Sequence, residues 1–285
     1  MSTLYIVATP IGNLGDMTPR AVEVLRSVQL IGAEDTRNTI KLLNHFSIAT
    51  PLTAYHKFNE REKTEELVRR MREEDIDVAI VTDAGTPCIS DPGWIIADAA
   101  IQSGIPVLAV PGCSAVISAL SVSGFDVQRF MFLGFYPREN KEQGEFIQSI
   151  RSSDSEVFVI YESPKRLIET LTDVAKAFPR ARISVSNDLT KKFEKTVRGD
   201  IGEVISALSQ SEKTELGEYV VVLEVKKEQK RQEEDPVSPE GMLVDELVKR
   251  GGTLKDAVNR LAATEKFRKN ELKSAAMRIK ELFSI

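Results

Sequence analysis

The hydrophobic positions of this chain fall into short, continuous apolar runs that are separated by segments with helical periodicity. The runs are rich in β-branched residues, which is typical of strands whose two faces are both covered. In the first half of the chain these runs alternate with helix patterns, so a mostly parallel α/β sheet is expected there. The expected strands cover residues 4–9, 28–34, 77–82 and 105–110.

Helix-start signals separate these strands. Thr18-Pro19 combines a capping side chain with a proline at the first helical position, and Asp91-Pro92 is interpreted as a second start of this kind. Two further helices are expected over residues 60–73 and 114–121.

A second α/β unit is predicted to follow. Ser163-Pro164 is interpreted as the start of a helix whose apolar stripe runs to Ala175, and another helix is expected near residues 201–208. The strands predicted for this unit cover residues 130–135, 156–162, 182–188 and 218–225.

The C-terminal part of the chain has a different composition. Residues 226–240 are polar and charged and contain two prolines, which is typical of an exposed linker. The remainder carries amphipathic patterns for two or three short helices, interrupted at Gly251-Gly252, and is similar to a helix-turn-helix module. The predicted domains are an N-terminal α/β domain over 1–122, a second over 123–227, a linker over 228–240 and a helical module over 241–285.

The charge is unevenly distributed between these parts. The net charge is −5, but residues 241–285 carry a surplus of +4, whereas residues 1–225 carry −8. An acidic body argues against broad nucleic-acid binding, and a basic tail could supply local attraction to phosphates. We therefore expect the tail to dock RNA, with Lys266, Lys269 and Lys273 among the contacts.

Several classes of protein are disfavoured. No apolar run approaches the roughly 18 residues that span a bilayer, so no membrane association is expected. Two isolated cysteines and two histidines give neither a disulfide framework nor a metal site, and a reducing, cytoplasmic location follows as the default. The P-loop, the GxGxxG fingerprint and the GxSxG elbow are also absent.

Three loops follow predicted strands and combine glycine and proline with small polar residues. They cover residues 9–16, 82–93 and 110–115. Glycine allows the backbone to approach a ligand closely, although ordinary turns also need these residues. Because ligands of open α/β sheets bind at the carboxyl ends of strands, the three loops together predict a ligand cleft.

Other polar clusters have two interpretations. The segment AEDTRNT (33–39) fits a helix start capped by Asp35 or Thr36, and Glu34 could form a structural pair with Arg37. The segment AYHKFNE (54–60) and the lysines of 161–166 and 187–194 fit solvated surface loops equally well, unless they face the same cleft.

Seven motifs, taken together, identify a family. In chain order they are LYIVATPIGNLGD, AEDTR, VTDAGTPCISDPG, VPGCSA, YESPKRL, LTKKFE and GEYVVVLE. They closely resemble the ribosomal RNA small-subunit methyltransferase I family of the tetrapyrrole-methylase (class III) superfamily. Tetrapyrrole enzymes usually show GxGxGD in the first loop, where this chain has ATPIGNLGD.

The resemblance implies a fold and an activity. The fold would be two α/β domains of the tetrapyrrole-methylase type plus a small helical C-terminal module, with S-adenosylmethionine in the cleft between the domains. The chain would act as a homodimer and methylate the ribose 2′-oxygen of a cytidine in the decoding region of 16S ribosomal RNA, within the 30S subunit.

The resemblance also implies site residues. The cofactor would contact Ile11, Asp83, Gly85, Thr86, Pro87, Ile89, Pro111, Gly112, Ser114, Ala115, Tyr161 and Glu162. The substrate would contact Asn13, Glu34, Thr36, Arg37, His56 and Glu60, and Lys165 and Arg166 are added as basic neighbours. No metal is expected. The candidate bases are Asp35, Glu34, Asp16, His56 and Lys191, of which Asp35 and Lys191 rank first. A lysine acts as a base only where its pKa is depressed, and Lys191 could equally hold a phosphate.

Two features leave alternatives open. The family pattern has an Arg-Glu pair where this chain has Asn187-Asp188, which weakens any role for that pair. The alternative functions are another class III methyltransferase, acting on a tetrapyrrole or a protein side chain, and a non-catalytic ribosome-assembly factor that binds RNA through its tail.

Overall fold

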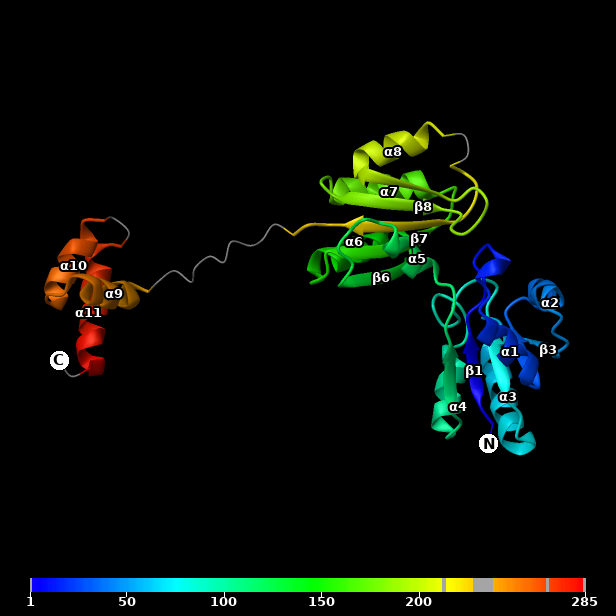
Figure 1. The fold of residues 1–285 in the computed structure, drawn as a ribbon. Coiled ribbons are helices and arrows are strands. Elements are labelled where there is room, and N and C mark those ends of the chain that lie inside the picture. Colours follow the sequence, from blue (N-terminus) through cyan, green and yellow to red (C-terminus); the bar gives the residue numbers. More distant parts are fainter. Residues whose placement is uncertain (1, 212–213, 228–237, 265–266, 284–285) are drawn as a thin grey trace. The chain divides into compact units, whose positions relative to one another are not determined.

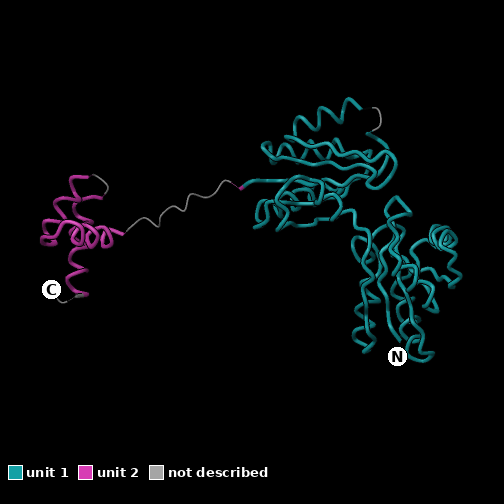
Figure 2. The backbone as a smooth tube through the Cα atoms, in the orientation of Figure 1, with its two compact units in different colours: residues 1–226 teal, residues 227–285 magenta. Residues whose placement is uncertain are grey.

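The computed structural model describes residues 2–211, 214–227, 238–264 and 267–283. The chain divides into two compact units, residues 1–226 and residues 227–285 (Figure 2). Most of the predicted linker, residues 228–237, lies outside the described residues. Pro239 and Glu240, which were predicted to end that linker, already belong to the first helix of the second unit.

The first unit begins with a fully parallel five-stranded sheet in the order β3-β2-β4-β1-β5 (Figure 1). Strands β2 and β4 are buried along their whole length, as expected for strands between two helical layers. The strands are β1 (Leu4–Val7), β2 (Leu30–Ala33), β3 (Leu52–Ala54), β4 (Val78–Val81) and β5 (Val107–Val110).

Helices cover both faces of this sheet. Apolar residues of α1 and α2 form one core with the strands, and those of α3 and α4 form another. Thr18 caps α1 and Asp35 caps α2 through side-chain oxygens, which confirms both predicted starts. The helices are η1 (Leu14–Asp16, one 3-10 turn), α1 (Pro19–Ser27), α2 (Thr36–His45), α3 (Glu60–Glu74) and α4 (Trp94–Gln102).

Two predicted helix starts are wrong. Helix α4 begins at Trp94, after Gly93 with φ +138°, and Asp91 does not cap it. The Asp91 carboxyl is instead half-buried at a cavity near Glu34. The helix predicted to begin at Ser163-Pro164 begins at Leu167, because a turn precedes it in which Ser163 bonds to a neighbouring carboxylate.

The second sheet is mixed, in the order β6-β7-β10-β8-β9. Strands β6 and β7 are parallel, and the other neighbours pair antiparallel. Helices α6, α7 and α8 contribute to the core on one face. The elements are β6 (Phe130–Phe135), α6 (Asn140–Ser152), β7 (Val157–Glu162), α7 (Leu167–Ala177), β8 (Arg182–Asn187), β9 (Lys195–Asp200), α8 (Ile201–Ser209) and β10 (Tyr219–Glu224).

Helix α5 (Ala115–Ser121) covers the other face of the second sheet, although it follows β5 of the first sheet (Figure 1). Its apolar residues form one core with β7 and β10, and the Arg198 guanidinium donates a 2.8 Å hydrogen bond to the Val122 carbonyl at its end. The domain boundary predicted after residue 122 remains a prediction, while α5 belongs to the second sheet by its packing.

In its described residues, the second unit is a bundle of three helices, α9 (Pro239–Arg250), α10 (Leu254–Ala262) and α11 (Lys269–Phe283). Leu243, Leu261 and Leu272, one from each helix, are buried in its core. The break predicted at Gly251-Gly252 is confirmed, and Thr253 with Asp256 forms a capping box that starts α10. Throughout the described residues, no helix is long and apolar enough to cross a membrane.

Candidate functional site

The main cavity of the first unit lies between the carboxyl edge of the first sheet and the carboxyl ends of strands β6 and β7 of the second sheet. Strands β4, β1 and β5 are neighbours, so the three glycine- and proline-containing loops that follow them reach the same edge of the first sheet. Opposite them, the ends of β6 and β7 lie beside the start of β10, because β10 runs antiparallel to β7. The volume between these loops is about 410 Å³, within the usual range for small-molecule sites.

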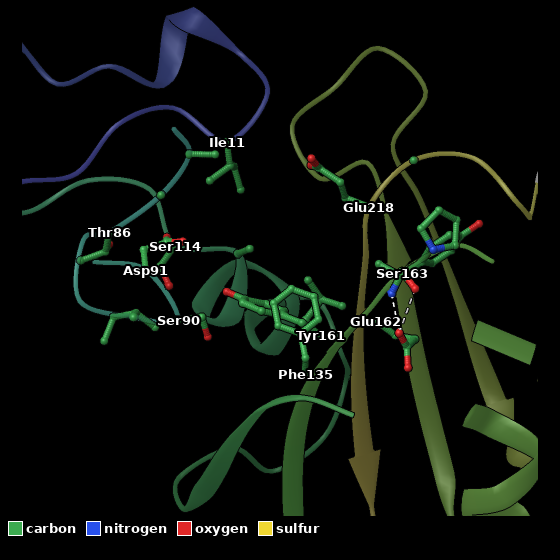
Figure 3. A pocket seen from close by; sticks show the side chains of 18 residues that line it. Ile11, Thr86, Ser90, Asp91, Ser114, Phe135, Tyr161, Glu162, Ser163 and Glu218 are labelled. Carbon is green, nitrogen blue, oxygen red and sulfur yellow. Dashed lines mark hydrogen bonds between the residues drawn. The ribbon is translucent and has the colours of Figure 1, made fainter. Parts of the chain in front are cut away.

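Figure 3 shows the side chains around this cavity. Thr86, Ser90, Asp91 and Ser114 come from the loops of the first sheet, and Phe135, Tyr161, Glu162, Ser163 and Glu218 from the second sheet. The Phe135 and Tyr161 rings form an edge-to-face pair with centroids 5.4 Å apart. The cavity therefore has one polar wall and one wall with an aromatic surface.

Hydrogen bonds between the loops fix the polar wall. Thr9 and Gly85 exchange two backbone hydrogen bonds, of 2.8 and 3.1 Å, and the Thr86 hydroxyl donates to the Cys113 carbonyl at 2.9 Å. Gly85 has φ +88°, a conformation that suits glycine. The three loops are consequently tied to one another before any ligand binds.

The carboxylate of Glu162 lies at the opposite wall and is almost completely buried. Its Oε1 accepts hydrogen bonds from the backbone N–H and the hydroxyl of Ser163, at 2.6 and 3.1 Å. Its Oε2 accepts a 2.6 Å bond from the Thr170 hydroxyl, and Arg166 forms a 3.6 Å ion pair with Oε1. A buried carboxylate with this many partners is fixed in orientation.

Asp91 is a second carboxyl at the cavity, in a different electrostatic setting. Burial and the nearby negative charge of Glu34 raise its pKa to about 6. Burial and the charge of Asp91 together raise the pKa of Tyr161 to about 12, so its hydroxyl stays protonated. Asp91 thus changes charge close to neutral pH.

The charges of the lining restrict the ligand. Of the described residues that line the main cavity, Asp91, Glu162 and Glu218 are acidic, and none is lysine or arginine. Arg166 and Lys191 offset Glu162 and Glu218 from outside the lining, and the remaining carboxyl, that of Asp91, makes the lining attract a cation and repel phosphate groups. The site is therefore suited to a positively charged or zwitterionic molecule with a flat apolar part.

A second cavity of about 340 Å³ adjoins the first and shares Ile11, Ala84 and Glu218 with it. Its walls come from the loop after β1, the first half of α2 and the end of β4. Lys191 joins them from the loop between β8 and β9.

The structure brings together much of the predicted site but distributes it over both cavities. The predicted cofactor residues that line the main cavity are Ile11, Gly85, Thr86, Ile89, Ser114, Ala115, Tyr161 and Glu162. Asp83, Asn13 and Lys191 line the second cavity. Pro87, Pro111, Gly112, Glu34, Asp35, Thr36, Arg37, His56, Glu60, Lys165 and Arg166 line neither.

The two residues ranked first as catalytic are poor bases. Hydrogen bonds from Arg37 hold the pKa of Asp35 at about 2. Burial lowers the pKa of Lys191, but hydrogen bonds to Glu218 and Asp188, at 2.9 and 3.0 Å, outweigh it and leave that pKa raised. Lys191 is thus a permanent cation, and the condition for its action as a base is not met.

Several other predicted residues have structural partners. Arg37 pairs with Asp35 at 2.6 Å and not with Glu34, which accepts a 2.6 Å bond from the Thr82 hydroxyl. The Arg166 guanidinium donates to the carbonyls of Tyr136 and Pro137. A Cβ at Gly112 would lie 3.0 Å from the Ala8 Cβ, directly after β1, so close packing of the protein by itself disfavours a side chain at this position.

Lys269 and Lys273 are exposed on α11 of the second unit, one helical turn apart, whereas Lys266 lies outside the described residues. Sequence reasoning missed Ala84, Ser90, Asp91, Phe135, Ser163, Pro164, Gly217, Glu218, Tyr219 and Val220 as individual lining residues. Gly217 carried a usable signal, because Gly-Glu directly precedes an apolar strand in GEYVVVLE. Phe135 carried none, since an aromatic residue at a strand end usually belongs to a core.

The described residues contain no group of three or more His, Cys, Asp or Glu side chains placed to hold a metal ion. Cys88 and Cys113 are free thiols, both half-buried.

Comparisons with known proteins agree on one family. Residues 3–205 match the family described as Tetrapyrrole (Corrin/Porphyrin) Methylases. Ribosomal RNA small subunit methyltransferase I of Synechocystis sp. is 40% identical over 276 residues, which cover 95% of this chain and 96% of the relative.

Solved structures share the fold at low identity. Diphthine synthase aligns with a TM-score of 0.62 and 12% identity, over 80% of this chain and 91% of its own. Uroporphyrin-III C-methyltransferase from Thermus thermophilus, solved in complex with S-adenosylhomocysteine, aligns with a TM-score of 0.54 and 16% identity, over 78% and 97%. The chain belongs to the tetrapyrrole methylase family and, within it, to the ribosomal RNA small subunit methyltransferase I group.

Proposed function

We propose that this protein transfers a methyl group from S-adenosylmethionine to 16S ribosomal RNA in the 30S subunit. The acceptor is the ribose 2′-oxygen of a cytidine in the decoding region, and the active unit is a homodimer. The names of the relatives support an RNA substrate. The homodimer is supported by exposed Trp94 and Ile101 on α4 and Leu108 on β5, because exposed apolar groups of this size favour a protein interface.

The acidic lining of the main cavity is the observation that carries this proposal. S-adenosylmethionine has a sulfonium and an ammonium group, which suit a wall with carboxylates and without lysine or arginine. The aromatic surface of Phe135 and Tyr161 suits its flat base, and the backbone at Gly85 permits close approach. A nucleoside triphosphate would meet repulsion at the same wall.

When bound, the cofactor supplies an activated methyl group, and the chain must position the acceptor in line with it. Glu218 lines both cavities, so it is our candidate for the group that accepts the hydroxyl proton. Lys191, which bonds to it at 2.9 Å, is a positioning residue that fixes its carboxylate. Glu218→Gln should lower kcat by about 10²- to 10⁴-fold, the usual contribution of a general base.

The basic C-terminal unit is proposed to dock the RNA. Lys269 and Lys273 are exposed, whereas Arg260 and Arg278 form ion pairs with Glu246 and Glu240 at 2.7 and 2.5 Å. The lysines of α11 are therefore better candidates for phosphate contacts than these two arginines.

Calorimetry and methyl mapping test the proposed function. The protein should bind S-adenosylmethionine and not ATP. The 16S RNA of 30S subunits from a strain without this enzyme should gain one 2′-O-methylcytidine when treated with the protein and S-adenosylmethionine. ATP binding in preference to S-adenosylmethionine would refute the cofactor assignment, and a methyl group on a base or on another nucleotide would refute the acceptor assignment.

A further inference from the structure

The second cavity lies in the position that an acceptor requires. It shares Ile11, Ala84 and Glu218 with the main cavity, so a ligand in one lies directly beside a ligand in the other. Methyl transfer needs reacting atoms within about 3–3.5 Å of each other before reaction. At about 340 Å³, the second cavity is also large enough for a small polar ligand.

An aspartate and an asparagine form a fixed pair in the wall of this cavity. The Asn38 side-chain amide donates to Asp83 Oδ2 at 3.0 Å, and the Asp35 backbone N–H donates to Asp83 Oδ1 at 3.2 Å. Both residues of the pair line the cavity. A carboxylate has about four lone-pair positions and an amide has two N–H groups, so each can also bond to a ligand.

The charges around this cavity balance. Lys41 and Lys191 are cationic, and Asp83 and Glu218 are anionic. A site for a phosphate group would have a surplus of cations, as phosphate recognition by lysine and arginine requires. A balanced lining with fixed donors and acceptors favours an uncharged polar group, such as a nucleobase.

We propose that the second cavity holds the base of the acceptor nucleotide and that Asp83 and Asn38 select cytosine by its pairing edge. This inference rests on the proposed function. Asp83 accepts a hydrogen bond from the 4-amino group, as carboxylates do in reading cytosine, and the Asn38 amide donates to the adjacent ring nitrogen. A base bound here is turned out of any stack, which is how enzymes that modify single nucleotides gain access to them.

Uracil provides the discriminating comparison. It presents a carbonyl oxygen where cytosine has an amino group, so it would place an acceptor against the Asp83 carboxylate. Asparagine at position 83 has nearly the same shape and adds an N–H donor. Asp83→Asn should therefore accept uracil better and cytosine worse.

The test measures 2′-O-methylation of unmethylated 30S subunits that carry cytidine or uridine at the acceptor position. The cytidine-to-uridine ratio of kcat/KM should fall by about 10- to 100-fold in Asp83→Asn. S-adenosylmethionine affinity should stay within about twofold, because Asp83 does not line the main cavity. The matched control is Asp154→Asn, which makes the same change at an exposed carboxylate between α6 and β7, outside both cavities, and should leave the ratio unchanged.

Each failure has a distinct meaning. If wild type methylates neither substrate, the proposed function and this inference fall together. If wild type is active and the ratio is unchanged in Asp83→Asn, only the inference falls. Loss of cofactor affinity in a folded Asp83→Asn protein would assign Asp83 to the cofactor site and would overturn the inference as well. Should Asp83→Asn not fold, Asn38→Ala tests the same pair, and undiminished methylation of cytidine would overturn the inference.

Discussion

Asp91 offers a direct test of the electrostatics of the main cavity. Its pKa is about 6 in the folded chain, against 3.8 for an ordinary aspartate. The folded state therefore binds more protons than the unfolded state between about pH 4 and pH 6, and this group reduces stability as the pH rises through that window. Asparagine has a similar shape and cannot ionise, so Asp91→Asn removes this pH-dependent loss.

The magnitude follows from the same pKa values. A difference of about two between folded and unfolded pKa corresponds to roughly 3 kcal/mol. Asp91 is only half-buried, and solvent screening reduces the effect, so we expect the variant to be more stable by about 1–2 kcal/mol at pH 7.5. The advantage should be small at pH 4, grow up to about pH 6 and then remain constant.

Urea unfolding of wild type and Asp91→Asn at several pH values between 4 and 8 measures this difference. Asp154→Asn, which changes an exposed carboxylate between α6 and β7 outside both cavities, controls for the change of net charge. Under the proposed function, Asp91→Asn should also bind the cationic cofactor more weakly, so stability and affinity should change in opposite directions. The reasoning would be refuted if Asp91→Asn and wild type had equal free energies of unfolding at both pH 4 and pH 7.5. It would also be refuted if the variant were less stable than wild type at pH 7.5.

Three further predictions follow from other parts of the chain. Thr170→Val removes a buried donor to Glu162 and should lower the free energy of unfolding by about 2 kcal/mol, whereas Thr170→Ser keeps the hydroxyl and should lose much less. Thermal unfolding of both variants and wild type measures this difference, and equal losses in the two variants would contradict the prediction. Deleting residues 236–285 should leave cofactor affinity nearly intact, raise KM for 30S subunits and flatten its salt dependence; unchanged kinetics across a salt series would count against RNA docking. Treatment with EDTA should leave methylation unchanged, and activity that returns only with one added metal would contradict this.

The inner strands of the first sheet could be predicted because strands buried on both faces must be apolar throughout, whereas the outer strand β3 (Leu52–Ala54) was not predicted. β2 and β4 show that pattern without interruption. The apolar pattern does not reveal β9 (Lys195–Asp200), because its sequence KTVRGD has little apolar content. An outer strand is exposed along one edge and carries charge there, so its sequence resembles a loop.

The parts of the site formed by tight loops could be predicted from the sequence. The parts formed by side chains at strand ends could be predicted less well. The loops with Gly85 and Ser114 were identifiable because tight turns need particular residues. Glu218 approaches the cavity only because β10 lies next to β7 in the opposite direction, and Phe135 only because β6 pairs with β7, where it lies opposite Tyr161. These pairings join positions far apart in the sequence, and no local pattern encodes them.

The position of α5 has a consequence for how the first unit can be divided. A fragment of residues 1–122 would contain α5 without the strands that cover Val116, Ala119 and Leu120. It should aggregate or bind a separately expressed fragment 123–226, since the helix would act as a missing piece of that partner's core. A cut before Ser114 should instead give a second fragment that retains its own core helix. In the first fragment, the loops after β1 and β4 would then lack the part of the main-cavity lining that Ser114 and Ala115 provide.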